Sequence, residues 1–328
     1  MAGAVGDYRA GPRVSRFTLW AVVGLAHWAR WDRSDGVRGN KQGRVASVSR
    51  VRIVTDSTSD VPPDVAERLR VTVVPAYVQI ADHSYRDASS SEGLGRDEFY
   101  ARLPTMPSMP TTAVPPAHEF TVAYRSLADD ADAVIAIVIS ANLSGMYNVA
   151  RLGAQGVDDL KIHVVDSGQL SMGLGWMVVA AAEAAAKGRS VQEILALVKD
   201  MRPRVHVYAM LDTLEYLRRS GRVNWARAKA AQLLRIKPIL QVLMGHVRDI
   251  GRTRTRRRAI ERLVEIVRAQ GPLERLAILH TCSPDVEDLR SRLVDLCPAE
   301  QIFTVVVTTI IGAHIGPRGL GVAAVTAG

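Results

Sequence analysis

Three apolar runs in the first half of the chain each stop abruptly at small hydroxyl and carboxylate side chains. The first, VRIVTDSTSD, ends in Asp56–Ser59, the second in Ser140–Ser144 and the third in Asp166–Ser167. Buried parallel strands have this pattern, because both of their faces are covered until the chain leaves the sheet. Ligands of open parallel sheets bind at the carboxyl ends of the strands. We therefore expect an α/β fold with a polar site at this edge.

Ser, Asp and Asn also cap helices, so one such strand end indicates little by itself. Three of them, together with Thr111–Thr112 in a proline-rich segment, favour a polar site. The sequence predicts strands at 52–55, 71–80, 133–139 and 161–165, and helices at 62–70, 96–103, 117–128, 142–153, 171–187 and 190–201. Asp60 is a candidate N-cap of the first helix. Residues 81–95 are predicted to be loop, and the prolines of 104–116 exclude regular structure there.

The pattern changes after Arg204 to an α+β order. The sequence predicts strands at 205–211, 239–244, 247–250, 276–281 and 302–311, helices at 213–220, 225–234, 258–270 and 285–296, and a glycine-rich end at 312–321. We therefore predict a parallel-sheet α/β/α domain over residues 51–187. A second α/β domain with a mixed sheet follows over residues 188–328.

Composition narrows the class of protein. The chain has 328 residues, 48% of them apolar, and a mean hydropathy near zero, as in globular proteins that do not span membranes. Residues 1–50 carry nine Lys or Arg and three Asp, and so hold most of the net charge of +9. We expect this segment to be a disordered or weakly structured basic extension. The charge is weak support for nucleic-acid binding, which we do not expect.

Cys282 and Cys297 form no CxxC or metal-ligand spacing, which predicts reduced thiols in a cytoplasmic protein and no metal site. The basic stretch Gly251–Arg258 (GRTRTRRR) is typical of a solvated helix start. If it has a binding role, we expect a docking site for a partner.

Seven segments, in this order and at these spacings, resemble the DegV family of bacterial fatty-acid-binding proteins. They are IVTDSTSD (53–60), PTTAVPPAHEF (110–120), ISANLSGMYNVA (139–150), VVDSGQLSMGLG (164–175), LDTLEYLRRSGRV (211–223), KPIL (237–240) and GAHIGPRGLG (312–321). The resemblance covers the chain from Val51 to its end. It implies a two-domain fold with a lipid tunnel between a parallel-sheet domain and a mixed-sheet domain.

The resemblance also implies the site. A Thr of the proline loop and a Ser of the LSG segment hold the fatty-acid carboxyl group in this family, and they match Thr112 and Ser144. Arg222 and His314 match residues close to that group. We further expect Asp56 and Ser57, at the end of the first strand, to lie near it.

The activity that the resemblance implies is binding without catalysis and without a cofactor. The protein presents a long-chain fatty acid to a separate ATP-dependent fatty-acid kinase, which makes an acyl-phosphate. Peripheral contact with a membrane is compatible with this role. The chain departs from the family where Ala113 and Val114 replace Ser-Gln and Met146 replaces Thr. These changes bear on the hydrogen-bond network and on the acyl-chain preference.

The acyl tail would supply most of the affinity, since about 0.8 kcal/mol per buried CH₂ gives a C16 chain about 12 kcal/mol before ordering costs. Candidate tunnel walls are 134–139, 170–177, 233–243 and 305–311. The alternative is a small hydrolase or acyl-transfer enzyme using Ser144 and His314, although NLSGM is not the GxSxG elbow. A nucleotide binder has weaker support, because no Walker motif is present, and a DNA-binding regulator would rest on charge alone.

Overall fold

The three apolar runs form neighbouring strands of one parallel sheet. They are β1 (Val51–Asp56), β6 (Ala133–Val138) and β7 (Lys161–Asp166), and β2 (Thr72–Val74) completes the order β2-β1-β6-β7. All six residues of β6 are buried, as expected for a strand covered on both faces. The computed structural model describes residues 50–87, 94–228, 236–297 and 302–328, which all belong to one unit spanning residues 47–328.

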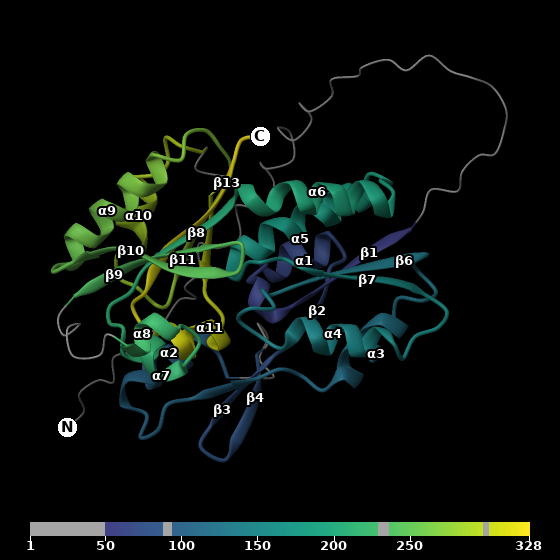
Figure 1. Cartoon of the computed structure of the whole chain (residues 1–328), viewed down its shortest axis with the longest axis horizontal. Helices are drawn as coiled ribbons and strands as arrows, with labels where there is room; N and C mark the ends of the chain where they lie inside the picture. Colours follow the sequence, from purple (N-terminus) through teal and green to yellow (C-terminus); the bar gives the residue numbers. More distant parts are fainter. Residues whose placement is uncertain (1–49, 88–93, 229–235, 298–301) are drawn as a thin grey trace, which may run out of the picture. The chain divides into compact units, whose positions relative to one another are not determined.

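Helices cover both faces of the parallel sheet (Figure 1). α3 (Ala117–Arg125) and α4 (Met146–Ala154) pack together on one face, and α5 (Ser171–Ala186) lies on the other, with α6 (Val191–Arg204) against it. The short α1 (Pro63–Arg68) follows β1. Every residue of α5 from 171 to 182 is buried, because α5 also contacts the second sheet. An all-round apolar helix is what a position between two sheets requires.

The second sheet is mixed and has six strands in the order β10-β9-β8-β13-β11-β12. Its strands are β8 (Val205–Met210), β9 (Lys237–Leu243), β10 (His246–Thr253), β11 (Leu273–His280), β12 (Ile302–Val306) and β13 (Leu320–Thr326). Only the β11–β12 pairing is parallel among these described strands. α9 (Arg256–Arg268) and α10 (Val286–Ser291) enclose a separate core on the far face of this sheet. The predicted fold class, a parallel sheet followed by a mixed sheet, is confirmed.

A small antiparallel sheet of order β4-β3-β5 lies beside the two large ones. Its strands are β3 (Tyr77–Ile80), β4 (His83–Arg86) and β5 (Thr111–Ala113), and four short helices complete the architecture: α2 (Arg96–Arg102), α7 (Glu215–Ser220), α8 (Asn224–Ala228) and α11 (Thr309–Ile315). α11 contacts β3, β5, α2 and α7, so it occupies the junction between these parts.

Two predictions of irregular structure were wrong. The proline-rich segment contains β5, because its Thr-Thr-Ala core between Pro110 and Pro115 contains no proline and pairs with β3. The predicted loop after residue 81 contains β4, which forms a hairpin with β3. In both cases the segment becomes a strand by pairing with β3, although its own sequence shows no strand pattern. The strand predicted at 71–80 is in fact two strands, β2 and β3, which belong to different sheets.

The end of one strand and the N-cap of one helix also differ from the prediction. The strand predicted at 302–311 ends at Val306, because the Thr308 side chain accepts a hydrogen bond from the Ile310 N–H and starts α11. Asp60 does not cap α1, whose N-cap position is Pro62. The extension predicted for residues 1–50 and the end of the helix predicted at 225–234 fall mainly outside the described residues. The division of the unit near residue 187 stays a prediction.

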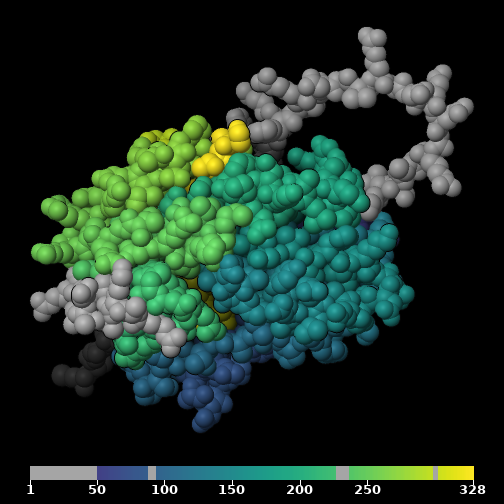
Figure 2. All heavy atoms as spheres, in the orientation of Figure 1, coloured from purple at the N-terminus to yellow at the C-terminus, as the bar shows by residue number. Residues whose placement is uncertain are grey.

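The β9–β10 hairpin closes one side of the junction between the two large sheets (Figure 2). The Gly245 N–H at its tip donates to the Gly168 carbonyl at 2.6 Å. A Cβ on Gly245 would lie 2.7 Å from the Ser140 hydroxyl, and its φ of 79° is left-handed. Glycine is therefore required where the hairpin meets the loops at the carboxyl ends of the parallel strands.

Candidate functional site

A cavity of about 700 Å³ lies between the carboxyl ends of the parallel strands and one face of the mixed sheet. This volume lies inside the range of about 300–1,000 Å³ typical of small-molecule sites. Most of its wall is aliphatic, and polar side chains enter it from several loops. The polar lining residues are Thr58, Thr112, Asn142, Ser144, Asn148, Ser171, Arg222, His280, Thr281 and His314.

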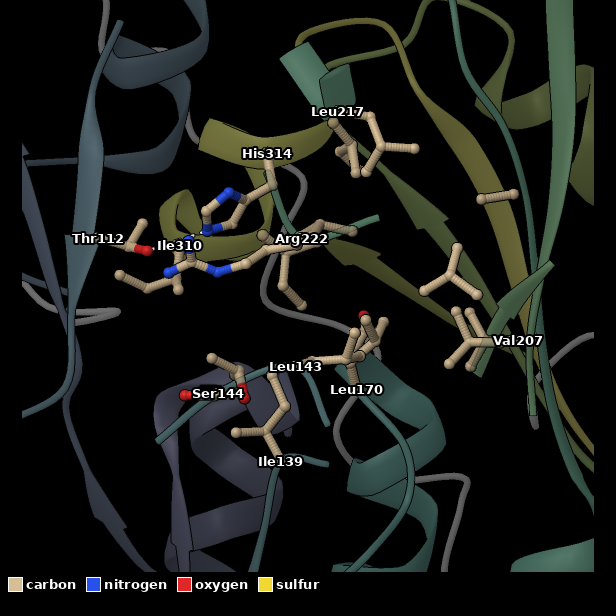
Figure 3. Close-up of a pocket in the computed structure, with 18 of the residues that line it drawn as sticks. Thr112, Ile139, Leu143, Ser144, Leu170, Val207, Leu217, Arg222, Ile310 and His314 are labelled. Atoms are coloured by element: carbon tan, nitrogen blue, oxygen red, sulfur yellow. Dashed lines mark hydrogen bonds between the residues drawn. The ribbon is translucent and has the colours of Figure 1, made fainter. Parts of the chain in front are cut away.

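Three of the predicted site residues meet at one end of the cavity (Figure 3). The Thr112 hydroxyl and His314 Nε2 share a hydrogen bond of 2.9 Å. β5 positions Thr112 through its pairing with Val78 of β3, and α11 carries His314. Arg222 follows α7, and its side chain extends toward Thr112. Segments more than 200 residues apart in sequence thus build one polar end.

Ser144 lines the same cavity from the loop between β6 and α4. Its hydroxyl accepts a hydrogen bond from the Met146 N–H at 3.2 Å, which leaves the hydroxyl proton available to an acceptor in the cavity. Ser144 lies just before the first turn of α4, where the positive end of the helix dipole favours an anion. The arrangement suits a carboxylate.

Burial holds His314 in its neutral form. Loss of solvation is the main cause that lowers the pKa of this imidazole to about 4, and the neighbouring Arg222 charge lowers it further. The pKa of His280, also in the lining, is lowered by burial as well. Arg222 is therefore the one charged side chain at pH 7 among the described residues that line the cavity, and it lies exposed at the surface.

We expect an NMR titration of the His314 ring protons to give a midpoint near pH 4. The Arg222→Gln variant should raise this midpoint, because it removes the nearby positive charge, while burial keeps it below the usual value of about 6.5. A midpoint near 6.5 in the unaltered protein would show that the ring is solvated, contrary to its place in the cavity wall.

The opposite part of the cavity is aliphatic, and no aromatic ring occurs among its described lining residues. Alternate residues of β8 and β9 face it: Val207 and Ala209 from β8, Leu211 directly after β8, and Leu240 and Val242 from β9. Tyr208 and Met210 point to the core under α9 instead. Val207, Leu211 and Leu240 are at most 4% exposed, so this part lies deep in the molecule.

The depth of the two ends differs. Ala141, Asn142, Gly145 and Arg222 line the cavity and are exposed at the surface. The aliphatic part is enclosed by buried side chains. The cavity therefore has a polar mouth and an apolar interior.

Asp56 and Ser57, expected near the carboxyl group, are not among the described residues that line the cavity. The buried Asp56 carboxylate accepts the Thr58 N–H at 2.9 Å and the Ile139 N–H at 2.8 Å, and so joins the ends of β1 and β6. Ser57 accepts the Ala76 N–H at 3.1 Å. Both side chains accept hydrogen bonds from backbone N–H groups. Thr58 is the residue of this loop that lines the cavity.

The segments predicted to form the tunnel wall line the cavity only in part. Ile139, Leu170, Val242 and Ile310 line the cavity. Residues 134–138 belong to the core of the parallel sheet instead, because both faces of β6 are covered by helices. The wall contributed by β8 was missed, although the alternation of its side chains is a signal that could have indicated it. Residues 233–235 lie outside the described residues.

The predicted hydrolase arrangement gains no support from the hydrogen bonds. His314 Nε2 bonds to Thr112, and none of the hydrogen bonds among the described residues joins Ser144 to His314. A serine nucleophile requires a base within hydrogen-bond reach and a third group to orient that base.

Two arginines of the basic stretch 251–258 bond to neighbouring segments, whereas Arg254, Arg257 and Arg258 are exposed. Arg252 pairs with Asp249, and Arg256 bonds to Asp212, Asp285, Ser283 and the Arg318 carbonyl. In the part of the chain that the structure describes, no helix is long and apolar enough to cross a bilayer. The same residues contain no group of three or more His, Cys, Asp or Glu side chains placed to bind a metal ion.

Comparison with known proteins agrees with the motifs. The family model described as "Uncharacterised protein, DegV family" matches residues 50–327. The chain belongs to the DegV family. A DegV domain-containing protein of Streptomyces coelicolor is 35% identical over 279 residues, which cover 83% of this chain and 97% of the relative. Protein DegV of Bacillus subtilis is 29% identical over 281 residues, covering 83% and 98% of the two chains.

Solved structures share the architecture. A DegV-family protein from Thermus thermophilus, whose structure is described as fatty-acid binding, is 34% identical with a TM-score of 0.78. DegV from Bacillus subtilis, described as a fatty acid binding protein, is 28% identical with a TM-score of 0.76. Each match covers 85% of this chain and 100% of the solved chain. The DegV fold therefore extends over the whole described unit.

Proposed function

We propose that this DegV-family protein binds one long-chain fatty acid without chemically altering it. The carboxylate lies at the polar mouth with Thr112, Ser144, Arg222 and His314, and the tail runs into the aliphatic interior beside β8 and β9. The observation that carries this proposal is the division of one cavity into a polar mouth with a single cation and a deep aliphatic part. The fatty-acid-binding relatives support the same class of ligand.

The chemistry of the mouth suits a carboxylate that must remain accessible. Two hydroxyls can donate to it, and the neutral His314 can act as a third polar partner. Arg222 supplies a compensating charge from the exposed rim, where water screens it. A mouth of this kind holds the anion without enclosing its oxygens in a buried bidentate clamp.

The exposed position of the carboxylate end supports a further part of the proposal. The protein would act in the cytoplasm and present the fatty acid to a separate ATP-dependent kinase that forms the acyl-phosphate. This role would place it in fatty-acid metabolism. Kinase turnover of palmitate should then depend on this protein in a reconstituted mixture. Equal acyl-phosphate formation with and without it would contradict the presentation role.

Native mass spectrometry of protein purified from bacterial cells tests the binding itself. We expect a species heavier by one fatty acid, which added palmitate converts to a single homogeneous complex. A lipid-free protein that does not take up palmitate would contradict the proposal. Hydrolysis of a p-nitrophenyl ester that is abolished by Ser144→Ala would instead favour the enzyme alternative.

A further inference from the structure

A buried cluster of charged side chains lies next to the cavity but outside its polar mouth. Arg96 Nη1 is 3.0 Å from Asp60 Oδ1, and the Asp60 side chain has no exposed surface. Asp87, also buried, accepts hydrogen bonds from the hydroxyls of Thr308 and Thr309. Arg96 thus forms an ion pair with Asp60 and also feels the charge of Asp87, an arrangement that is costly in the interior unless the charged groups have fixed partners.

Asp60 joins three separate segments of the fold. Its Oδ2 accepts the Ser171 hydroxyl at 2.6 Å, its Oδ1 accepts the Thr308 N–H at 2.9 Å, and Arg96 of α2 forms the ion pair. Ser171 lines the cavity and begins α5 with a left-handed φ of 49°, which is rare for a residue with a Cβ. Asp60 therefore contacts a constrained part of the cavity wall and the start of α11.

The position of α11 depends on these contacts. The helix has seven residues, too few to be stable by itself, so its neighbours must fix its place. Its N-terminal end is held by Asp60 and Asp87 through Thr308 and Thr309. Farther along, Tyr100 packs so closely that a Cβ on Gly312 would overlap its hydroxyl. His314 follows within the same short helix, about 9 Å from Thr308 at 1.5 Å per residue.

We propose that Asp60 is a positioning residue for the fatty-acid carboxyl site: by holding the start of α11 and Ser171 against Arg96, it sets the place of His314 beside Thr112. This inference rests on the proposed function, because it assigns Asp60 a role in that same site. Asp60 itself does not line the cavity among the described residues, so it acts through α11 and not on the ligand.

The charges around Asp60 make its contacts with Arg96 and α11 depend on pH. The groups that face it are Arg96 and Tyr100 of α2 and Asp87 after β4, and Asp87 in turn acts on Asp56. Burial raises the pKa of Asp60 to about 6, against the opposing effect of Arg96. Below that pH Asp60 takes up a proton and loses its charge interaction with Arg96. Because the raised pKa means that the folded chain binds this proton more tightly than the unfolded chain does, protonation does not lower the free energy of unfolding as pH falls through about 6. We expect the position of α11, and with it the His314 resonances and the palmitate Kd, to change over the same pH range.

The Asp60→Asn variant tests the inference, because it removes the charge and keeps the shape, while Asp87 still balances Arg96. We expect its Kd for palmitate at pH 7.5 to rise about tenfold, within the usual range of coupling between sites. In the ligand-free variant the NMR midpoint of His314 should move up from about 4 toward 6.5, as α11 loosens and admits water.

Ile260→Val is the matched control, since Ile260 is buried in the separate core under α9. It should lower stability while leaving both the His314 midpoint and the palmitate Kd unchanged. An Asp60→Asn protein with an unchanged His314 midpoint and unchanged Kd would overturn the positioning role. If unaltered protein binds no palmitate, the proposed function fails, but the His314 midpoint of ligand-free Asp60→Asn still decides the role of Asp60.

A measurement on the unaltered protein covers the case in which the variant does not fold. ¹³C NMR follows the Asp60 carboxyl group between pH 5 and 8, and the His314 ring is followed in the same samples. We expect the His314 resonances to shift with the midpoint of Asp60. His314 resonances that stay constant while Asp60 titrates would overturn the inference.

Discussion

Palmitate binding is expected to weaken by at least about 100-fold when Thr112→Val and Ser144→Ala are combined in one protein. Each hydroxyl would donate a hydrogen bond to a carboxylate, and such bonds contribute about 1.5–3 kcal/mol each. Valine and alanine keep most of the local volume but leave the carboxylate without these donors. Isothermal titration calorimetry with palmitate at pH 7.5 measures the loss.

Two controls separate this effect from a loss of folding. Thr111→Val changes the neighbouring residue of β5, which is exposed and bonds to Gln79, so it should leave the Kd unchanged. Hexadecanol has the same tail without a charge, and its binding should fall much less than that of palmitate in the double variant. Unchanged palmitate affinity in the double variant would remove Thr112 and Ser144 from the site.

A shortened cavity is expected to select shorter acids. Ala209→Phe places a ring on the face of β8 that lines the aliphatic part. If the ring excludes three or four CH₂ groups at about 0.8 kcal/mol each, palmitate binding weakens by roughly 100-fold. Octanoate and decanoate, which end before the ring, should bind as they do to the unaltered protein. A competition series from C8 to C18 measures the change.

His206→Phe is the matched control for that series. His206 lies on the opposite face of the same strand, where its ring stacks on Tyr208, so an added phenyl group there does not enter the cavity. Its chain-length profile should equal that of the unaltered protein. An Ala209→Phe protein that still prefers palmitate would show that the tail does not run beside β8.

The parallel sheet could be predicted because its strands carry their own signal. β6 is apolar without interruption, β1 is apolar up to Val54 except for Arg52, and both lead into hydroxyl and carboxylate side chains. β4 and β5 could not be predicted in this way, since each is a short segment that becomes a strand only by pairing with β3. Local composition does not report such a partner, whether it is the adjacent strand, as for β4, or lies more than 30 residues away, as for β5.

The sequence is also insufficient to assign the roles of single side chains in the site. In the loop 56–60, five small polar residues follow one another, and the sequence gives no reason to separate them. The turn directs Thr58 into the cavity, while Asp56 and Ser57 bind backbone N–H groups and Asp60 joins the buried charge cluster. Their roles depend on how the backbone turns after β1, which the residue types alone do not determine.

The junction around α11 also depends on tertiary packing. The segment 302–311 is β-branched except for Phe303 and indicates a strand by propensity. Thr308 ends the strand because its hydroxyl caps the following turn and bonds to Asp87, a residue more than 200 positions earlier. The motif around His314 identified the residue, but its neighbours Thr112 and Arg222 could be placed beside it only by the fold.

A crystal structure of the complex with palmitate tests the central claim most directly. We expect one palmitate in the cavity, with its carboxylate oxygens within about 2.7–3.2 Å of the hydroxyls of Thr112 and Ser144 and its tail against Val207 and Ala209. A palmitate bound elsewhere, or bound in the reverse direction with its carboxylate beside β8, would contradict the account.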